Sequence, residues 1–268
     1  MFGSWRSRRK KLFIFTALFL LVVFLSFKLY PYIFPEPNCF DQEQNGDEED
    51  IDCGGSCAAI CHDNILPLEI RFSRFIETEE NLFDLMALVQ NPNSDKNLEG
   101  SILDYTFSIY DKAGALVHKI PATTLMPIGQ TFPIIMQNVP VNFEGSGNAV
   151  SRISLDIENF NRPWVRVDEV FKNNFFFVED YIFEREKNNI SQLNVSLKNI
   201  TRATFKDVPV RVLLSDERGN VIAVNETLIK DIAPEATAEL SFTWRIPLEI
   251  ENPEVNIYPI VTPDTYIR

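Results

Sequence analysis

The sequence predicts an all-β protein, in which two tandem antiparallel β-sandwiches follow one N-terminal transmembrane helix and a small disulfide-rich loop module. Three observations predict this architecture. A long apolar run lies near the N-terminus, four cysteines gather within 23 residues beyond it, and apolar residues alternate with polar ones from Leu66 onward. The expected parts are a basic tail (1–11), a transmembrane helix (12–34), an acidic cysteine-rich module (35–64), a first sandwich (65–160) and a second sandwich (161–268).

The apolar run is long enough to span a membrane only with its flank. Residues 12–27 are apolar apart from Thr16 and Ser26, and a helix needs roughly 20 residues to cross the hydrocarbon core. The span is complete if Lys28 extends its ammonium to the interface and the residues up to Phe34 form an aromatic belt. Pro31 predicts where regular helix ends.

Basic residues precede the run and predict its orientation: Arg6, Arg8, Arg9, Lys10 and Lys11. Such a cluster stays in the cytoplasm, so we expect a single-pass cell-membrane protein with its C-terminal bulk outside the cytoplasm. A cleaved secretory signal peptide is the alternative, because a basic region before an apolar core fits that as well. No small-x-small site follows the core, which favours an uncleaved anchor.

The charge of the remaining chain excludes some partners. The formal net charge is −13, and because six basic residues and no acid precede Glu36, the rest of the chain carries −19. Nucleic acid and anionic lipid require positive surface, so neither is expected as a partner of this part. The excess of acid serves solubility, or it attracts divalent cations or basic partners.

The four cysteines, Cys39, Cys53, Cys57 and Cys61, predict two disulfides. An even, clustered number in an extracytoplasmic segment is typical of a disulfide framework, and three pairings are possible. A zinc site is the less favoured alternative, because ligand-spaced CxxC pairs are missing and His62 is the one histidine nearby. Gly54 and Gly55 would let the backbone turn tightly between Cys53 and Cys57.

An acidic ladder in the same module suggests a calcium site. Counted from Asp41, oxygen-bearing side chains and a glycine fall at the spacing of an EF-hand loop: Asp41, Glu43, Asn45, Gly46, Asp47, Glu49 and Asp52. Glu43 departs from the usual residue at its position, and Asp52 is shorter than the usual bidentate Glu. A solvated acidic loop is the alternative to calcium binding.

The string CFDQEQNGDEEDIDCGGSCAAIC resembles a short Cys-rich motif of secreted and surface-anchored proteins. The matching residues are Asn45, Gly46, Asp47, Glu48, Asp52, Cys53, Gly54, Gly55 and Cys57. The resemblance covers about 23 residues. It implies an extracytoplasmic module and no particular molecular activity.

Alternation with a period of two predicts strands with one face on a core. The first half shows it in Ile70 and Phe72, in 83–89 and in 103–109, with turn residues between the runs. The second half repeats the layout: Asp111 and Gly114 recur as Asp216 and Gly219, both at an offset of 105. We therefore expect two homologous sandwiches with a boundary near 159–163 and no flexible linker, hence a rigid tandem.

The residues Phe107, Tyr110, Asp111 and Gly114, after the turn Asn91-Pro92-Asn93, resemble the signature of FxLYD-type domains. These are immunoglobulin-like sandwiches similar to the water-stress class of late-embryogenesis-abundant proteins. The second half departs from the signature, with a bare Asn199 where the Asn-Pro-Asn turn would stand. The resemblance implies an immunoglobulin-like extracytoplasmic module without established catalytic residues to transfer.

No pattern in the sequence indicates a reaction, so we expect a protein that is not an enzyme. His118 lies in a predicted strand and is expected to be exposed at an edge. The consecutive aromatics Phe175, Phe176 and Phe177 cannot all face one side of a strand. They are expected either to be buried between the two sandwiches or to bind a protein partner.

The expected function is therefore adhesion, scaffolding or envelope assembly by a membrane-anchored, extracytoplasmic, non-catalytic protein. The alternative is a membrane-tethered ligand-binding or sensing subunit that depends on calcium bound in the loop 41–52.

Overall fold

The computed structural model describes residues 3–33, 38–61, 65–93, 98–99, 102–127, 131–142, 149–157, 165–166, 175–187, 190–262 and 265–267. Two compact units are present, Met1–Ala58 and Ala59–Arg268. Both predicted sandwiches lie in the second unit, while the predicted boundary between them, 160/161, lies outside the described residues.

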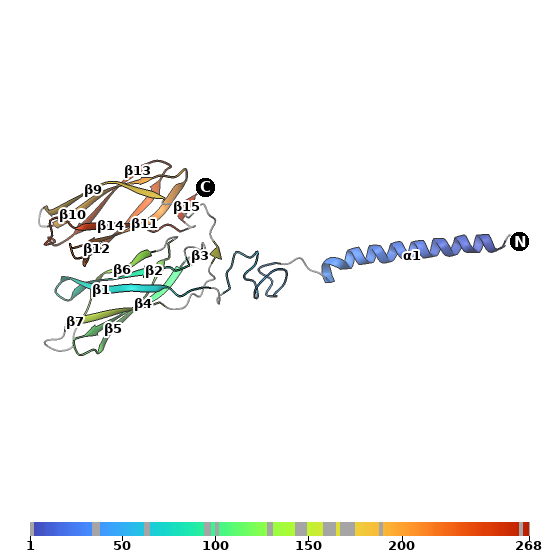
Figure 1. Ribbon diagram of the computed structural model, residues 1–268, viewed down its shortest axis with the longest axis horizontal. Coiled ribbons are helices and arrows are strands. Elements are labelled where there is room, and N and C mark those ends of the chain that lie inside the picture. Colours follow the sequence, from blue (N-terminus) through green and yellow to red (C-terminus); the bar gives the residue numbers. More distant parts are fainter. Residues whose placement is uncertain are drawn as a thin grey trace. The chain divides into compact units, whose positions relative to one another are not determined.

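The first unit contains the helix α1 (Gly3–Ile33), which includes the basic residues as well as the apolar run (Figure 1). The hydroxyl groups of Thr16 and Ser26 donate to backbone carbonyls one turn earlier, those of Leu12 (2.7 Å) and Val22 (2.8 Å). The helix passes Pro31, contrary to expectation, and ends two residues later. A proline in the last turn removes a single helical hydrogen bond, which explains why the helix continues.

The second unit is built from strands. The first sandwich contains β1 (Glu69–Glu79), β2 (Leu82–Gln90), β4 (Ile102–Asp111), β5 (Leu116–Leu125), β6 (Thr131–Pro140) and β7 (Val150–Ile157). The second contains β9 (Phe176–Lys187), β10 (Ile190–Asn199), β11 (Thr204–Ser215), β12 (Val221–Ile232), β13 (Thr237–Trp244), β14 (Glu254–Pro259) and β15 (Tyr266–Ile267). The short strands β3 (Leu98–Glu99) and β8 (Val165–Arg166) pair with each other.

The two sandwiches have the same topology. In the first, the sheets are β1-β2-β6 and β5-β4-β7; in the second, they are β9-β10-β13 and β12-β11-β14, the latter with β15 beside β11. All of these strand pairs are antiparallel. The predicted all-β fold with two antiparallel sandwiches is therefore confirmed.

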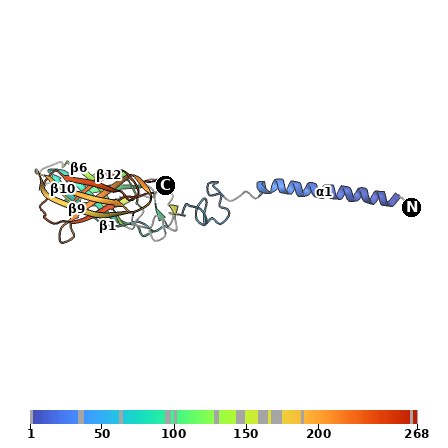
Figure 2. The same cartoon turned by 90° about the horizontal axis from the view of Figure 1, so that it is seen from above.

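Three clusters of buried side chains order the four sheets as layers. One cluster lies between β5-β4-β7 and β1-β2-β6, a second between β12-β11-β14 and β13-β10-β9, and a third joins β1-β2-β6 to β12-β11-β14 (Figures 1 and 2). The two inner sheets are thus covered on both faces. The alternating residues Phe83, Leu85, Ala87 and Val89, and likewise Leu103, Tyr105, Phe107 and Ile109, lie in the first core as predicted.

The same hairpin occurs once in each sandwich, as the repeat predicts. Asp111 Oδ1 accepts hydrogen bonds from the backbone N–H groups of Ala113 (2.9 Å) and Ala115 (2.8 Å). Asp216 Oδ1 accepts the equivalent bonds from Arg218 (2.9 Å) and Asn220 (2.8 Å). The glycines of these turns, Gly114 and Gly219, have φ values of 80° and 77°, which side chains with a Cβ rarely adopt.

An asparagine turn is also present in both sandwiches, and it corrects the sequence interpretation of Asn199. Asn91 is buried after β2, and its Oδ1 accepts from the backbone N–H of Asn93 at 2.9 Å. Asn199 is buried at the end of β10, and its Oδ1 accepts from the N–H of Thr201 at 3.0 Å. The second sandwich therefore keeps the asparagine turn without the proline, because the side-chain bond to the backbone two residues on is sufficient.

One predicted strand has a different phase. Ile70 pairs with Val89 and Phe72 with Leu88, so a register shift between them places the two side chains on opposite faces of β1. Ile70 and Phe72 are 40% and 39% exposed. The prediction that both face the core is wrong, because a bulge adds a residue that alternation cannot reveal.

Candidate functional site

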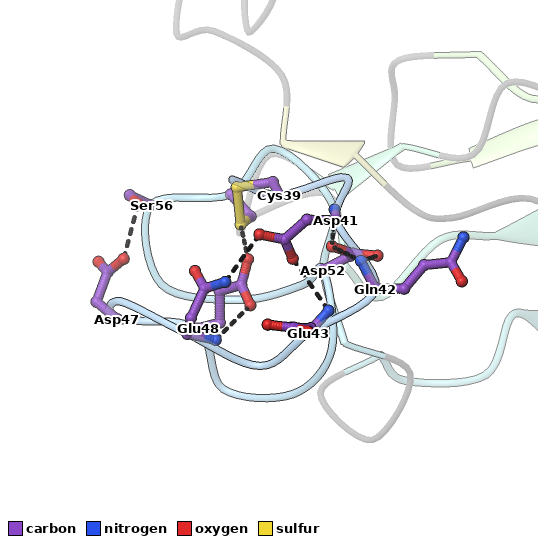
Figure 3. The surroundings of a disulfide bond; sticks show 10 residues. Cys39, Asp41, Gln42, Glu43, Asp47, Glu48, Asp52 and Ser56 are labelled. Atoms are coloured by element: carbon purple, nitrogen blue, oxygen red, sulfur yellow. Dashed lines mark hydrogen bonds between the residues drawn. A yellow bond between two sulfur atoms is a disulfide. The ribbon is translucent and has the colours of Figure 1, made fainter. Parts of the chain in front are cut away.

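The cysteine module is closed by a disulfide between Cys39 and Cys57, 18 residues apart (Figure 3). Cys53 and Cys61 are disulfide-bonded as well. The prediction of two disulfides is thus confirmed, and one of the three possible pairings is selected. Sulfur atoms in disulfides offer no thiolate, so the zinc alternative is wrong for these cysteines.

The two glycines of the module are required by close packing. Gly54 and Gly55 have φ values of 79° and 54°. A Cβ at Gly55 would lie 2.1 Å from the backbone oxygen of Asp47, and a Cβ at Gly54 would lie 2.6 Å from Cβ of Glu49. The tight turn predicted after Cys53 is therefore present, and it leaves no room for a side chain.

The carboxylates of the predicted calcium loop bind the loop's own donors. Asp52 accepts from the backbone N–H groups of Asp41 (3.0 Å) and Gln42 (3.0 and 3.2 Å), and it thereby closes the loop at its two ends. Asp41 accepts from the N–H of Glu43 at 3.0 Å and from the side-chain amide of Asn45 at 2.9 Å. Figure 3 shows these contacts.

Asp47 and Glu48 also have partners within the module. Asp47 accepts from the Ser56 hydroxyl at 2.7 Å, and Glu48 accepts from the backbone N–H of Asn45 at 3.0 Å. Among the described residues, the one group of three Cys, His, Asp or Glu ligand atoms within 4.8 Å of one another is Cys39, Glu48 and Cys57. This group contains the disulfide, so it is no calcium site.

Calcium binding by Asp41, Glu43, Asn45, Asp47, Glu49 and Asp52 stays a prediction, and these side chains would have to move together, because no three of the carboxylates lie within 4.8 Å of one another. Calorimetric titration of the full chain with calcium tests it. Binding heat that disappears in Asp41→Ala would support the site. Titration without heat would eliminate it.

The sequence analysis expected the two sandwiches to pack together, but it did not identify the residues of their interface. We call it the seam, and it consists of the buried side chains Met86, Leu213, Val221 and Val224. Partly buried residues pack against it, namely Ile76, Leu88, Ile135 and Tyr258. A signal was present: β2 and β11 have apolar residues in both phases of the alternation, which is typical of strands covered on both faces.

Arg211 of β11 connects the two sandwiches through hydrogen bonds. Arg211 is 6% exposed, and its guanidinium donates to Glu226 within the second sandwich (Nε to Oε2, 2.6 Å). Nη1 donates to the backbone oxygen of Pro133 (2.7 Å), and Nη2 donates to Thr124 Oγ1 (2.7 Å), both in the first sandwich. A planar group with five donors suits such a junction, because one side chain fixes three acceptors.

Two further contacts cross the seam. Gln137 Nε2 donates to the backbone oxygen of Val224 at 3.2 Å, and Arg74 Nη1 donates to Asn220 Oδ1 at 3.1 Å. Next to them, Asp84 is 3% exposed and accepts from the backbone N–H of Asn138 at 2.9 Å. Burial raises the pKa of the Asp84 carboxyl, while the hydrogen bonds from Asn138 and Gln137 oppose that shift.

The aromatic group occupies a different place from the one expected. Phe175 is 9% exposed and lies in the second core, where Phe176 also packs. The prediction that these rings are buried between the sandwiches is wrong, because the seam is formed by the opposite sheet. Phe177 is 58% exposed, as expected for one ring of three, and remains the candidate for partner binding.

The exposed position of His118, in the edge strand β5, agrees with the sequence prediction. In the part of the chain that the structure describes, one helix is long and apolar enough to cross a membrane, at Lys10–Tyr30. A helix so near the N-terminus can be an anchor or a signal sequence. Together with the disulfides, it indicates an oxidising compartment.

Comparisons with known proteins show no family for this chain. Neither a protein-family model nor a curated protein matches the sequence. Structural matches include a β-glucuronidase from glycoside hydrolase family 2, with 11% identity, a TM-score of 0.19, and coverage of 61% of this chain and 20% of that chain.

A β-glucuronidase 2 from Bacteroides uniformis shows 10% identity and a TM-score of 0.19 over 65% of this chain and 22% of its own. A β-galacturonidase from Eisenbergiella tayi shows 10% identity and a TM-score of 0.18 over 75% of this chain and 38% of its own. The chain thus spans well under half the length of the enzymes it matches, and likenesses this weak support no conclusion about its activity.

Proposed function

We propose that this chain is a membrane-anchored scaffold, which holds two fused β-sandwiches outside the cytoplasm and does so without catalysing a reaction. The observation that carries the proposal is the seam, in which apolar packing and the two hydrogen bonds that Arg211 donates to the first sandwich join the sandwiches. A rigid tandem presents binding surfaces at a fixed spacing, which is what a scaffold or adhesion module requires.

The anchor rests on separate support. α1 has a basic N-terminal end and an apolar run whose two hydroxyl groups are satisfied inside the helix. Such a helix suits a bilayer, where unsatisfied polar groups are costly. The four cysteines beyond it are all in disulfides, which suits an extracytoplasmic segment.

The non-catalytic part of the proposal rests on what the polar side chains do. Arg211 and Asp84 stabilise the seam, and Asp111, Asp216 and Asn199 shape turns. These groups are engaged in structural hydrogen bonds.

Protease accessibility on intact cells tests the proposal. We expect protease added outside to digest a C-terminally tagged full chain, while a cytoplasmic control protein survives. Protection of the tag, together with alkylation of four free thiols, would invert the topology and refute the proposal. Recovery of a shortened chain in the medium would instead support a cleaved signal peptide, and the proposal would then lose its membrane anchor.

A further inference from the structure

The helix α1 begins seven residues before the segment that is apolar enough to cross a membrane. It starts at Gly3, and that segment is Lys10–Tyr30. Seven helical residues add about 10 Å of length, and the headgroup layer on each side of a bilayer is about 5 to 8 Å thick. A helix that crosses the bilayer therefore carries residues 3–9 through one headgroup layer.

This end of the helix is strongly basic, and no acid precedes Glu36. The basic positions within residues 3–11 are Arg6, Arg8, Arg9, Lys10 and Lys11. Successive helical residues are rotated by about 100°, so the five positions surround the helix axis with no gap wider than about 100°. Charge on all sides suits lipids, which encircle a single span, better than a protein partner that contacts one side.

The apolar stretch is short for a bilayer, and this draws the basic end toward the membrane. Residues 12–27 form about 24 Å of helix, whereas the hydrocarbon core is about 30 Å thick. A short span is accommodated when flanking cations extend to the interface. Lys10 and Lys11 are exposed, and their stems can lie along the acyl chains while the ammonium groups reach the phosphates. The basic end is therefore held at the depth of the headgroups.

The other flank of the span carries the opposite charge. Lys28 is the one basic residue between Leu12 and Pro35, and residues 35–64 contain nine acids and no lysine or arginine. Basic residues near the bilayer surface attract anionic lipid, and acidic residues repel it. The attraction is thus confined to the leaflet that surrounds residues 3–11.

We propose that residues 3–11 of α1 bind the headgroups of anionic phospholipids in the cytoplasmic leaflet. The attraction between a basic residue and an anionic surface decays within a Debye length. Binding therefore requires that the basic residues stay close to the phosphates, and the unbroken helix provides this.

This lipid contact deepens the proposed anchor function and rests on it, because residues 3–11 reach the headgroups only if α1 spans the membrane. The contact adds the class of lipid that surrounds the anchor and the residues that select it.

Spin-labelled lipids test the preference of the full chain. The chain is reconstituted in vesicles of phosphatidylcholine and phosphatidylglycerol, and the fraction of each labelled lipid that the protein immobilises is measured. We expect phosphatidylglycerol to be preferred about fivefold, which is the effect of one basic residue for each headgroup. The preference should fall in 1 M salt, where charges are screened within about 3 Å. Equal immobilisation of the two lipids would overturn the proposal.

Neutral variants test which residues select the lipid. Arg6→Gln, Arg8→Gln and Arg9→Gln, made together, should nearly abolish the preference. The matched control changes the net charge equally, by replacing with glutamine three exposed basic residues of the sandwiches, namely Lys112, Lys230 and Arg245. The control should keep the preference of the unchanged chain. A preference that survives in the first variant, or that is lost in the control, would refute the assignment to residues 3–11.

Flotation of the vesicles reports the anchor separately. We expect the unchanged chain and both variants to float with the lipid, because the apolar span is intact in all three. A chain that floats without a lipid preference would refute the lipid contact alone. A chain that does not float would refute the anchor and the lipid contact together.

Discussion

The sheet β12-β11-β14 and its counterpart β5-β4-β7 have the same strand order but different outer faces. The offset of 105 aligns Leu213 with Ser108 and Val224 with Lys119. The first of each pair lies buried in the seam, while Lys119 is exposed. The topology of a sandwich therefore does not decide which sheet is covered. The outward phase of one sheet holds the apolar residues Leu213 and Val224, where the other sheet has the polar residues Ser108 and Lys119.

The other outer sheet teaches the same lesson. Aligning Asn91 with Asn199 matches Met86 and Leu88 of β2 with Asn194 and Ser196 of β10. Apolar residues face the seam in the first case, and polar residues stand in the outward phase in the second. The outward phase of β10 is therefore polar, although Phe177 and Ile182 of the neighbouring β9 are exposed beside it.

Truncating an equivalent core side chain should destabilise both sandwiches. Phe107→Ala removes a fully buried ring and should cost about 3 to 5 kcal/mol of unfolding free energy. Its counterpart Val212→Ala should cost less, because fewer buried atoms are lost. Denaturant unfolding of both variants checks this, and a loss below about 1 kcal/mol for Phe107→Ala would show that the ring is not a core residue.

Exchanging the residues at two equivalent outward positions should destabilise the covered sheet strongly and the exposed sheet hardly at all. Val224→Lys places an unpaired ammonium in the seam and should cost about 3 kcal/mol. The matched variant Lys119→Val changes an exposed position and should stay within about 0.5 kcal/mol. Equal effects in thermal unfolding would contradict the distinction between the two sheets.

Arg211 has Thr106 as its counterpart, so its contacts are particular to the seam. Arg211→Ala should cost about 2 kcal/mol, because the acceptors in the first sandwich lose their donors. Glu226 is 39% exposed and is rehydrated easily, which keeps the loss moderate. The measurement is urea unfolding, with Arg218→Ala, a surface arginine, as the control. Equal midpoints for the two variants would speak against a junction at Arg211.

Asp84 should make the seam sensitive to pH. Its raised pKa means that the folded chain holds the proton more tightly than the unfolded chain, so this group adds stability as pH falls and costs stability at neutral pH. Asp84→Asn removes the titrating carboxyl and should be more stable than the unchanged chain at pH 7. The difference should shrink as pH approaches about 4, the usual Asp value. If the stability difference between the variant and the unchanged chain did not depend on pH, the Asp84 carboxyl would not be buried as described.

The sequence allowed the fold to be predicted because alternation survives in strands such as 83–89 and 103–109. The residues of the seam were missed because Met86 and Leu213 stand in the phase that is usually polar, and Arg211 is a charged residue in a strand. Its partners Thr124 and Pro133 lie far away in the sequence, so no local pattern reveals its burial.

The aromatic and cysteine groups show two other limits. An extra residue at Glu179 shifts the phase of β9, so the positions of Phe176 and Tyr181 do not follow from alternation. The pairing of Cys39 with Cys57 depends on turns closed by Asp52 and by the packing of Gly55 against Asp47. Spacing alone left three choices.

The distance between two spin labels tests the fused tandem most directly. The native cysteines are all in disulfides, so Thr123→Cys in β5 and Thr243→Cys in β13 can be labelled on the two outermost sheets of the full chain. A single narrow distance distribution is predicted, and adding Val224→Lys should broaden it. A broad distribution in the otherwise unchanged chain would show that the two sandwiches move independently and that the seam does not hold them.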